Sequence, residues 1–349
     1  MICLLIIVYM IVFLFSMLEA SKQDDRYRKY AFFGIGILLI LLAAFKPVGV
    51  DHDSEQYEFN FYHYDSPQVV IFVEFTYRWL SQYLGYLMND VHIVFLFYAI
   101  LGVSLKLKAI KDLSPMWFMP VLIYIGNYYI LQDLTQIRAG VASGFLLTSI
   151  MPLANHNKQK CILMWLIAFC FHYSSIAFFP LLLLNNKELT VKQRITWTMV
   201  IPVGYVVYFS GIDFLSFLPL GFMQDKIDAY QKLRDSGIAG DTINVFGLIF
   251  LVKVIIYLYM LWMYETVYAY NKYIPIMLKM MGLSIFTFLI FNRLPVLSFR
   301  LSELYGIVDI IIFAHIYYTI KPDIIARFIV AIIGFSLLAT NIFYTQLLK

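Results

Sequence analysis

Three carboxylates and a tyrosine occur within seven residues, in the string DHDSEQY that begins at Asp51. Neighbouring carboxylates raise one another's pKa, because each negative charge disfavours the next, and a raised pKa suits a general base. Asp51 and Asp53 are therefore candidate catalytic residues, and the Tyr57 ring suits stacking on a sugar. The same string is equally typical of an acidic loop in water, and both interpretations stay open.

A second candidate lies at the start of a later apolar run, in the string QDLTQIRAG, which contains Gln136 and Arg138. A guanidinium group is always charged and binds phosphate through two parallel hydrogen bonds. Arg138 is therefore a candidate phosphate ligand, with Gln136 beside it. An arginine that merely extends from a helix end towards water would have the same surroundings.

A third candidate, His172, interrupts the apolar run 161–184 together with Ser174 and Ser175. Irregular backbone within a membrane is tolerated only where it faces protein or a water-filled cavity, so this break favours a functional histidine over a structural one. No cysteine or carboxylate lies at metal-ligand spacing from His172. The sequence therefore predicts an acid/base role and no metal site.

Two late arginines, Arg293 and Arg300, lie seven residues apart in the string FNRLPVLSFRLSELYGI. They would share one helical face, although Pro295 is expected to end a helix between them. They could hold an anionic head group, or Arg300 could pair with Glu303 and tether the loop. Arginines, a histidine and carboxylates together suit a substrate with a lipid tail, a diphosphate and a sugar, because guanidinium groups stabilise a departing phosphate.

The segments that position these residues are predicted to lie in a membrane. Hydrophobic residues make up 62% of the 349 residues and charged residues only 14%, whereas about 25% is typical of soluble proteins. The apolar runs are continuous, which predicts an all-α polytopic membrane protein and excludes a β-barrel. The net charge of +4 is spread over short loops, which excludes nucleic acid as a partner, and the three cysteines lie in apolar runs.

A helix needs about 20 apolar residues to cross the hydrocarbon core, and this criterion predicts about eleven or twelve transmembrane segments in one domain over residues 1–349. The run 161–184 is expected to form a hairpin broken at His172, because basic loops flank both of its ends. The positive-inside rule then places both termini outside. The other predicted spans are 2–18, 31–46, 91–105, 115–131, 138–154, 196–210, 244–264, 275–291, 303–320 and 326–346.

Two longer segments, 47–90 and 211–243, are expected on the outer side. The first contains the string VEFTYRWLSQYLGYL, which places Phe75, Trp79 and Tyr83 on one helical face and predicts an amphipathic helix at the membrane surface. The second carries charges of both signs and is expected to extend into water.

Five strings occur in the order VGVDHDSEQYEFNF, VEFTYRWL, QIRAGVASGFLL, FCFHYSSIAFFPLLLL and FRLSELYGIVDIII, and as a set they resemble the EpsG/Wzy family of bacterial polysaccharide polymerases. The resemblance implies an inner-membrane glycosyltransferase with a fold similar to the GT-C class. Such an enzyme joins undecaprenyl-diphosphate-linked repeat units into O-antigen or a related polysaccharide on the periplasmic face. It implies lipid-linked oligosaccharide substrates, no cofactor, and a chain-length regulator and a flippase as partners.

The family's motifs fall on residues of this chain in two groups. The resemblance assigns catalysis to His172, Asp53 and Asp51, and substrate binding to Arg138, Arg293, Arg300, Gln136, Tyr57 and Glu74. Two positions depart from the family pattern: Lys46 stands where an arginine is common, and Glu74 precedes Phe75 where a proline is common.

A flippase for lipid-linked oligosaccharides is the main alternative to a polymerase. It would need charges through the membrane midplane, where Lys253, Lys279, Asp309 and His315 are the expected ones. A membrane O-acetyltransferase is a third possibility, but it would need a basic motif near its histidine, and the segment around His172 has none.

Overall fold

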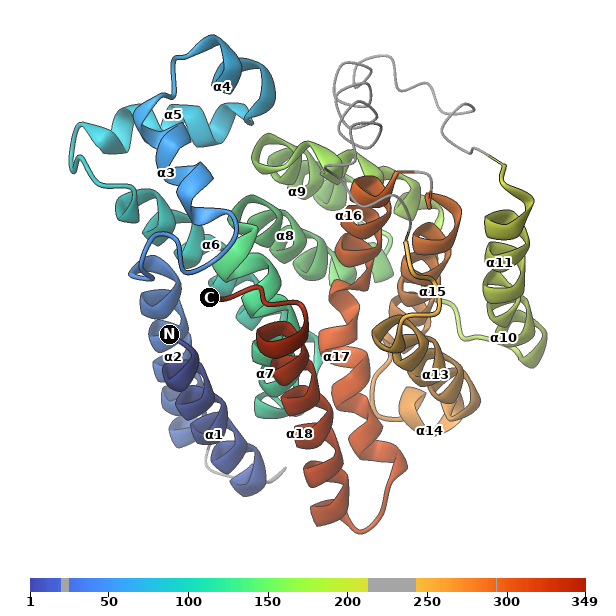
Figure 1. Ribbon diagram of the computed structural model, residues 1–349. Helices are drawn as coiled ribbons and strands as arrows, with labels where there is room; N and C mark the ends of the chain where they lie inside the picture. Colours follow the sequence, from blue (N-terminus) through green and yellow to red (C-terminus); the bar gives the residue numbers. More distant parts are fainter. Residues whose placement is uncertain (20–24, 213–242, 293) are drawn as a thin grey trace.

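The computed structural model describes residues 1–19, 25–212, 243–292 and 294–349, which fold as a bundle of helices (Figure 1). Among these described residues, four helices are long and apolar enough to cross a membrane, and there are shorter apolar helices beside them. The expected class, an all-α polytopic membrane protein, is thereby confirmed. The number of transmembrane segments stays a prediction, and the outer segment expected at 211–243 lies outside the described residues apart from its ends.

The helices follow one another through the bundle from blue to red in Figure 1. Those of the first half are α1 (Ile2–Leu18), α2 (Asp25–Ala44), α3 (Ser54–Tyr62), α4 (Pro67–Phe72), α5 (Phe75–Gly85), α6 (His92–Leu113), α7 (Phe118–Tyr124), the π-helix η1 (Ile125–Thr135), α8 (Ile137–Ala154), α9 (Lys158–Phe171) and the 3₁₀-helix η2 (Tyr173–Leu183). Those of the second half are α10 (Val191–Thr198), α11 (Val200–Ser210), α13 (Leu248–Trp262), α14 (Tyr264–Tyr268), α15 (Ile274–Ile290), α16 (Pro295–Tyr305), η5 (Gly306–Val308), α17 (Asp309–Ala314), η6 (His315–Thr319), α18 (Asp323–Ala339) and η7 (Thr340–Tyr344).

One end of the bundle carries the short helices α3, α4 and α5, which lie together beyond the ends of α2 and α6 (Figure 1). We call this the outer end. The C-terminal residues also reach it, because the Lys349 N–H donates a hydrogen bond to the Val50 carbonyl over 2.7 Å. Phe75, Trp79 and Tyr83 of α5 are exposed. The helix therefore presents an aromatic face with no cover from the rest of the described chain.

The opposite, inner end is held together by one buried carboxylate. Glu19 follows α1 and accepts hydrogen bonds from the N–H groups of Trp117 and Phe118, where α7 begins, over 2.8 and 3.1 Å. The same carboxylate pairs with Arg28 of α2 at 2.7 Å. A negative charge at a helix N-terminus satisfies donors that have no partner within the helix, so Glu19 fixes the start of α7.

The break expected at His172 is confirmed, since α9 ends at the preceding residue and η2 begins at the next. The Trp165 ring of α9 contacts the rings of Phe178 and Phe179 in η2, with centroids 6.2 and 6.0 Å apart. Trp165 is seven residues before His172, and Phe178 and Phe179 are six and seven residues after it. The run 161–184 therefore turns back at His172 as a hairpin.

The span expected at 303–320 is helical as far as Thr319, but the type of helix changes along it. The chain passes through α16, η5, α17 and η6 in this region. At Gly306 the side chains of Lys253, Tyr128 and Ser284 lie within 3.0 Å of the position that a Cβ would take. Lys253 also pairs with Asp309 at 2.8 Å. These polar side chains therefore lie close to the backbone at the point where the α-helix changes to a 3₁₀-helix.

The span expected at 91–105 was predicted too short, because α6 continues to Leu113 and carries Lys106 into the bundle. Lys106 Nζ lies 2.9 and 2.8 Å from the two carboxylate oxygens of Asp133 and 2.7 Å from the Gly140 carbonyl oxygen. The Tyr124 hydroxyl donates to the same carboxylate over 2.7 Å. This buried pair joins α6, η1 and α8, the elements that lead to the outer end.

Replacing Lys106 by Met should destabilise the protein, because it leaves the Asp133 charge buried without a partner. Loss of one member of a buried pair costs about 3–5 kcal/mol in free energy of unfolding. Adding Asp133→Asn should recover much of that loss. Lys108→Met is the matched control, since Lys108 forms an exposed pair with Asp112 that is worth about 1 kcal/mol or less. Thermal denaturation in detergent checks this, and an unchanged melting temperature for Lys106→Met would contradict it.

Candidate active site

Glu74 joins two of the predicted site residues at the outer end. Arg138 Nη1 donates a hydrogen bond to Glu74 Oε2, and His172 Nδ1 lies 3.2 Å from Glu74 Oε1. Only 4% of Glu74 is exposed. Burial would raise the pKa of Glu74, but the charge of Arg138 and the hydrogen bond and charge of His172 outweigh it and hold that pKa well below its usual range. Glu74 is therefore an anion that binds a guanidinium and an imidazole together.

This arrangement fixes the orientation of the His172 ring. The residue stands at the turn between α9 and η2 and is buried. A carboxylate acceptor favours the neutral tautomer with its proton on Nδ1, so Nε2 is left with a free lone pair. An imidazole held in this way is suited to accept a proton from a substrate hydroxyl.

The guanidinium of Arg138 is positioned from two sides. Besides its ion pair with Glu74, it lies over the Tyr57 ring, with Cζ 5.4 Å from the ring centroid. Arg138 Nε is buried and has no hydrogen-bond partner among the described residues. Buried donors are normally satisfied, so this N–H is a candidate contact for a bound anion.

The contacts of Tyr57 favour a different role from the one that its aromatic ring suggested. Its ring packs against Tyr77 and Phe95 and under Arg138, and only 3% of the residue is exposed. Burial raises the pKa of Tyr57 to about 12, so its hydroxyl stays protonated. With its ring covered, Tyr57 is placed to support Arg138 and offers no open face for stacking on a sugar.

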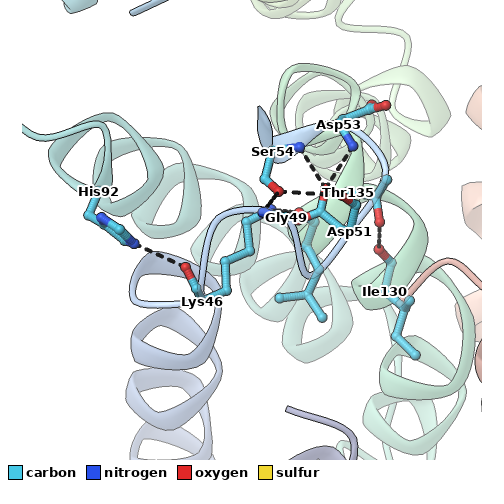
Figure 2. A network of polar contacts seen from close by, with 9 residues as sticks. Lys46, Gly49, Asp51, Asp53, Ser54, His92, Ile130 and Thr135 are labelled. Atoms are coloured by element: carbon cyan, nitrogen blue, oxygen red, sulfur yellow. Dashed lines mark hydrogen bonds and ion pairs between the residues drawn. The ribbon is translucent and has the colours of Figure 1, made fainter. Parts of the chain in front are cut away.

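Asp51 is engaged in holding its loop (Figure 2). Its Oδ2 pairs with Lys46 Nζ at 2.7 Å, and its Oδ1 accepts hydrogen bonds from the N–H groups of Asp53 and Ser54, each over 3.0 Å. Lys46 also donates to the Leu134 carbonyl, where η1 ends. Both members of the pair are fully buried. Asp51 therefore has its lone pairs in use, and its contacts favour a structural role over the acid/base role expected from the sequence.

The loop that carries Asp51 is tight because of a glycine. Gly49 has a φ of 86°, in the left-handed region that other residues rarely adopt. Its N–H donates to the Ser54 hydroxyl over 2.8 Å, so the loop closes directly onto the start of α3 (Figure 2). Leu348 pairs with Asp51 as a single antiparallel bridge. The acidic motif is thus held by α2, by η1 and by the C-terminal residues.

Asp53 is the carboxylate of this loop that faces the site. It is half-buried, and burial together with the Asp51 charge raises its pKa, against the opposing charges of Arg138, Lys46 and Arg300. Asp53 therefore lies within the fields of arginines from two different helices. A carboxyl group with a raised pKa can give up or take up a proton near neutral pH, so Asp53 is a candidate acid or base.

Two of the other predicted residues lie around this cluster, and one cannot be placed. Arg300 of α16 acts electrostatically on Asp53 and on His172. Gln136, just before α8, hydrogen-bonds the Glu303 side chain of α16. Arg293 lies outside the described residues. The structure therefore brings Asp53, Arg138 and His172 together around Glu74, with Gln136 and Arg300 at the edge.

Three contributors were missed or misjudged from the sequence. Lys46 was noted only as a departure from the family pattern and Glu303 only as a partner for Arg300, and Leu134 was not named. All three help to hold the site. Lys46 and Asp51 are five residues apart across a helix end and a glycine turn, which is a signal for a local ion pair. The local spacing pointed to Arg300 as the partner of Glu303 and not to Gln136, because the contact with Gln136 joins distant parts of the chain.

Replacing Asp53 by Asn should stabilise the protein at neutral pH. The pKa of Asp53 is raised by folding, so the folded state gains stability from the bound proton below the unfolded value of about 3.9 and loses it as the pH rises through the folded value. The variant has no charge to bury, so its gain should be largest at about pH 7 and fade towards about pH 4. Thermal melting in detergent at both values checks this. A variant less stable than the native chain at neutral pH would contradict it.

The comparisons with known proteins agree with the resemblance noted from the motifs. No curated protein and no solved structure matches the chain. The family model for EpsG matches residues 29–348, which include every site residue described above. The chain therefore belongs to the EpsG family, whose members are membrane proteins linked to exopolysaccharide synthesis.

Proposed function

We propose that this protein is a polysaccharide polymerase, which joins oligosaccharide repeat units carried on undecaprenyl diphosphate at the outer face of the bacterial inner membrane. The observation that carries the proposal is the Arg138–Glu74–His172 cluster, in which one buried carboxylate holds a phosphate-binding group and a base side by side. EpsG-family membership supports the substrate class. A glycosyl transfer from a lipid diphosphate needs both of these groups at one place.

In the proposed reaction, Arg138 and Arg300 bind the diphosphate of the donor. His172 Nε2 takes the proton of the acceptor hydroxyl, and the acceptor oxygen forms a bond to the anomeric carbon of the donor sugar. The bond between that carbon and the phosphate oxygen breaks, and its electron pair leaves with undecaprenyl diphosphate. Guanidinium groups favour this step, because they stabilise the negative charge that grows on the leaving phosphate. Asp53, which lies in the field of both arginines, is the second group of the site that could accept or donate a proton.

The charges within the bundle favour a polymerase over a flippase. A flippase would need cations along the membrane interior that are available to a passing diphosphate. Lys253 is instead paired with Asp309, and Lys106 with Asp133. Lys279 donates to the carbonyl and the side chain of Asn185. Lys253 and Lys106 are thus paired with carboxylates and Lys279 is held by neutral oxygen acceptors. The outer cluster, in contrast, has a guanidinium nitrogen without a partner among the described residues.

Replacing Arg138 by Ala should abolish polymerisation in cells while leaving the protein inserted in the membrane. Removal of one charge-stabilising donor costs about 10²–10³ in turnover. In a strain that lacks the native gene, the variant should yield surface glycan of one repeat unit, seen by gel electrophoresis. Arg194→Ala is the matched control, because Arg194 also pairs with a glutamate, Glu265, but on α10 away from the site. Long-chain products from Arg138→Ala at normal protein levels would contradict the proposal.

Glu74→Gln should act through His172 as well as Arg138, since Glu74 is a positioning residue that need not touch substrate. The neutral amide no longer favours a protonated imidazole, so the acidic limb of the pH–rate profile should move to lower pH. Turnover should fall by about 10²–10³, within the range for loss of an assisted proton transfer. Kinetics of the purified variant check both effects. A fall in rate with an unchanged profile would indicate a merely structural role.

A further inference from the structure

A second candidate binding site lies on the outer end, in the helices that also carry Tyr57 and Glu74. A cavity of about 190 Å³ opens between the end of α3 and the end of α5, and its lining includes Phe61, Tyr62, Tyr64, Gln82 and Asn89. Tyr86, which is 78% exposed, stands at its edge. The Tyr62 hydroxyl donates to the Asn89 carbonyl over 3.5 Å, which joins the two sides of the opening.

The lining of this cavity selects for an uncharged, hydroxyl-rich ligand. It contains aromatic rings, two carboxamides and a serine hydroxyl, and no ionisable acid or base other than tyrosine. Carboxamides offer donors and acceptors at once, which suits a hydroxyl group that also does both. Aromatic faces pack against the apolar face of a sugar ring. The cavity is smaller than the about 300 Å³ of sites for drug-sized ligands, so it would hold a small ring and not a long chain.

The position of the cavity relates it to the candidate active site. Phe61 lies one helical turn after Tyr57 on α3, and Gln82 lies eight residues after Glu74 along α5. At 1.5 Å per residue, that second separation is about 12 Å along the helix axis. An oligosaccharide that reacts beside Glu74 could therefore place a more distant sugar in the cavity.

We propose that this cavity is a glycan subsite, which holds an uncharged sugar of the oligosaccharide substrate at a distance from the bond that forms. The inference rests on the proposed polymerase function for its substrate. The subsite would hold the glycan while the lipid diphosphate occupies Arg138. The two ends of one substrate would then bind to different kinds of residue. The diphosphate would contact cationic side chains, and the sugar would contact uncharged and aromatic ones.

The test uses Gly85, which lines the cavity at the end of α5. A Cβ at this position would lie 3.5 Å from the Phe61 ring, which is ordinary contact, so Gly85→Ala should fold and bind normally. Gly85→Leu should fill the cavity. Tyr86→Ala removes an exposed ring and leaves the core intact. The ligands are oligosaccharides of two to five sugars, released by partial hydrolysis from the polysaccharide that the host strain makes, without lipid or phosphate.

Binding to the full-length protein in detergent is measured by saturation-transfer NMR. We expect transfer to sugar protons with the native chain, with Gly85→Ala and with Arg138→Ala, and at least a tenfold weaker affinity with Gly85→Leu and Tyr86→Ala. The subsite proposal is overturned if Gly85→Leu and Tyr86→Ala both bind with the affinity of the native chain, or if the native chain does not bind. Failure of the polymerase proposal has its own readout, which is surface glycan of unchanged chain length from the Arg138→Ala strain. The two outcomes are distinguishable because the Arg138→Ala variant retains the cavity.

Discussion

The outer site depends on one buried negative charge. Removing a carboxylate from water is costly unless cations and hydrogen bonds replace the water, and Glu74 obtains both from Arg138 and His172. The three residues come from the start of α5, the start of α8 and the turn after α9. Satisfying this one charge therefore requires that the outer helices dock on the transmembrane bundle, and the same contacts orient the groups that would act on a substrate.

Ion pairs at greater depth explain how a bundle of apolar helices keeps a definite arrangement. Dispersion and apolar contacts between helices are similar whichever way the helices slide, whereas a buried lysine has few acceptable positions. The pair Lys106–Asp133 joins α6 to η1, and Lys253–Asp309 joins α13 to α17. These pairs set the relative heights of the helices that carry Arg138 and Arg300 to the outer end.

Much of the fold could be predicted from the sequence, because transmembrane helices are specified by long local runs. The predicted span 2–18 coincides with α1, and 138–154 differs from α8 by one residue. The end of α6 was misjudged because it depends on a residue that is distant in sequence. Lys106 is tolerated inside α6 only because it pairs with Asp133. At Gly306, the span expected at 303–320 passes from α-helix to 3₁₀-helix where polar groups from other helices approach. The candidate site residues were proposed from residue type and motif, but the different surroundings of Asp51 and Asp53 depend on partners that are distant in sequence.

The outer cluster is proposed to transfer glycosyl groups between lipid diphosphates. The most direct measurement is extension of a defined undecaprenyl-diphosphate-linked repeat unit by the purified protein in detergent, without nucleotide sugars or other proteins. A polymerase should give a ladder of products, with one undecaprenyl diphosphate released for every bond formed. A single unextended unit after prolonged incubation with folded protein, or movement of that unit across vesicle membranes with no new bond, would contradict it.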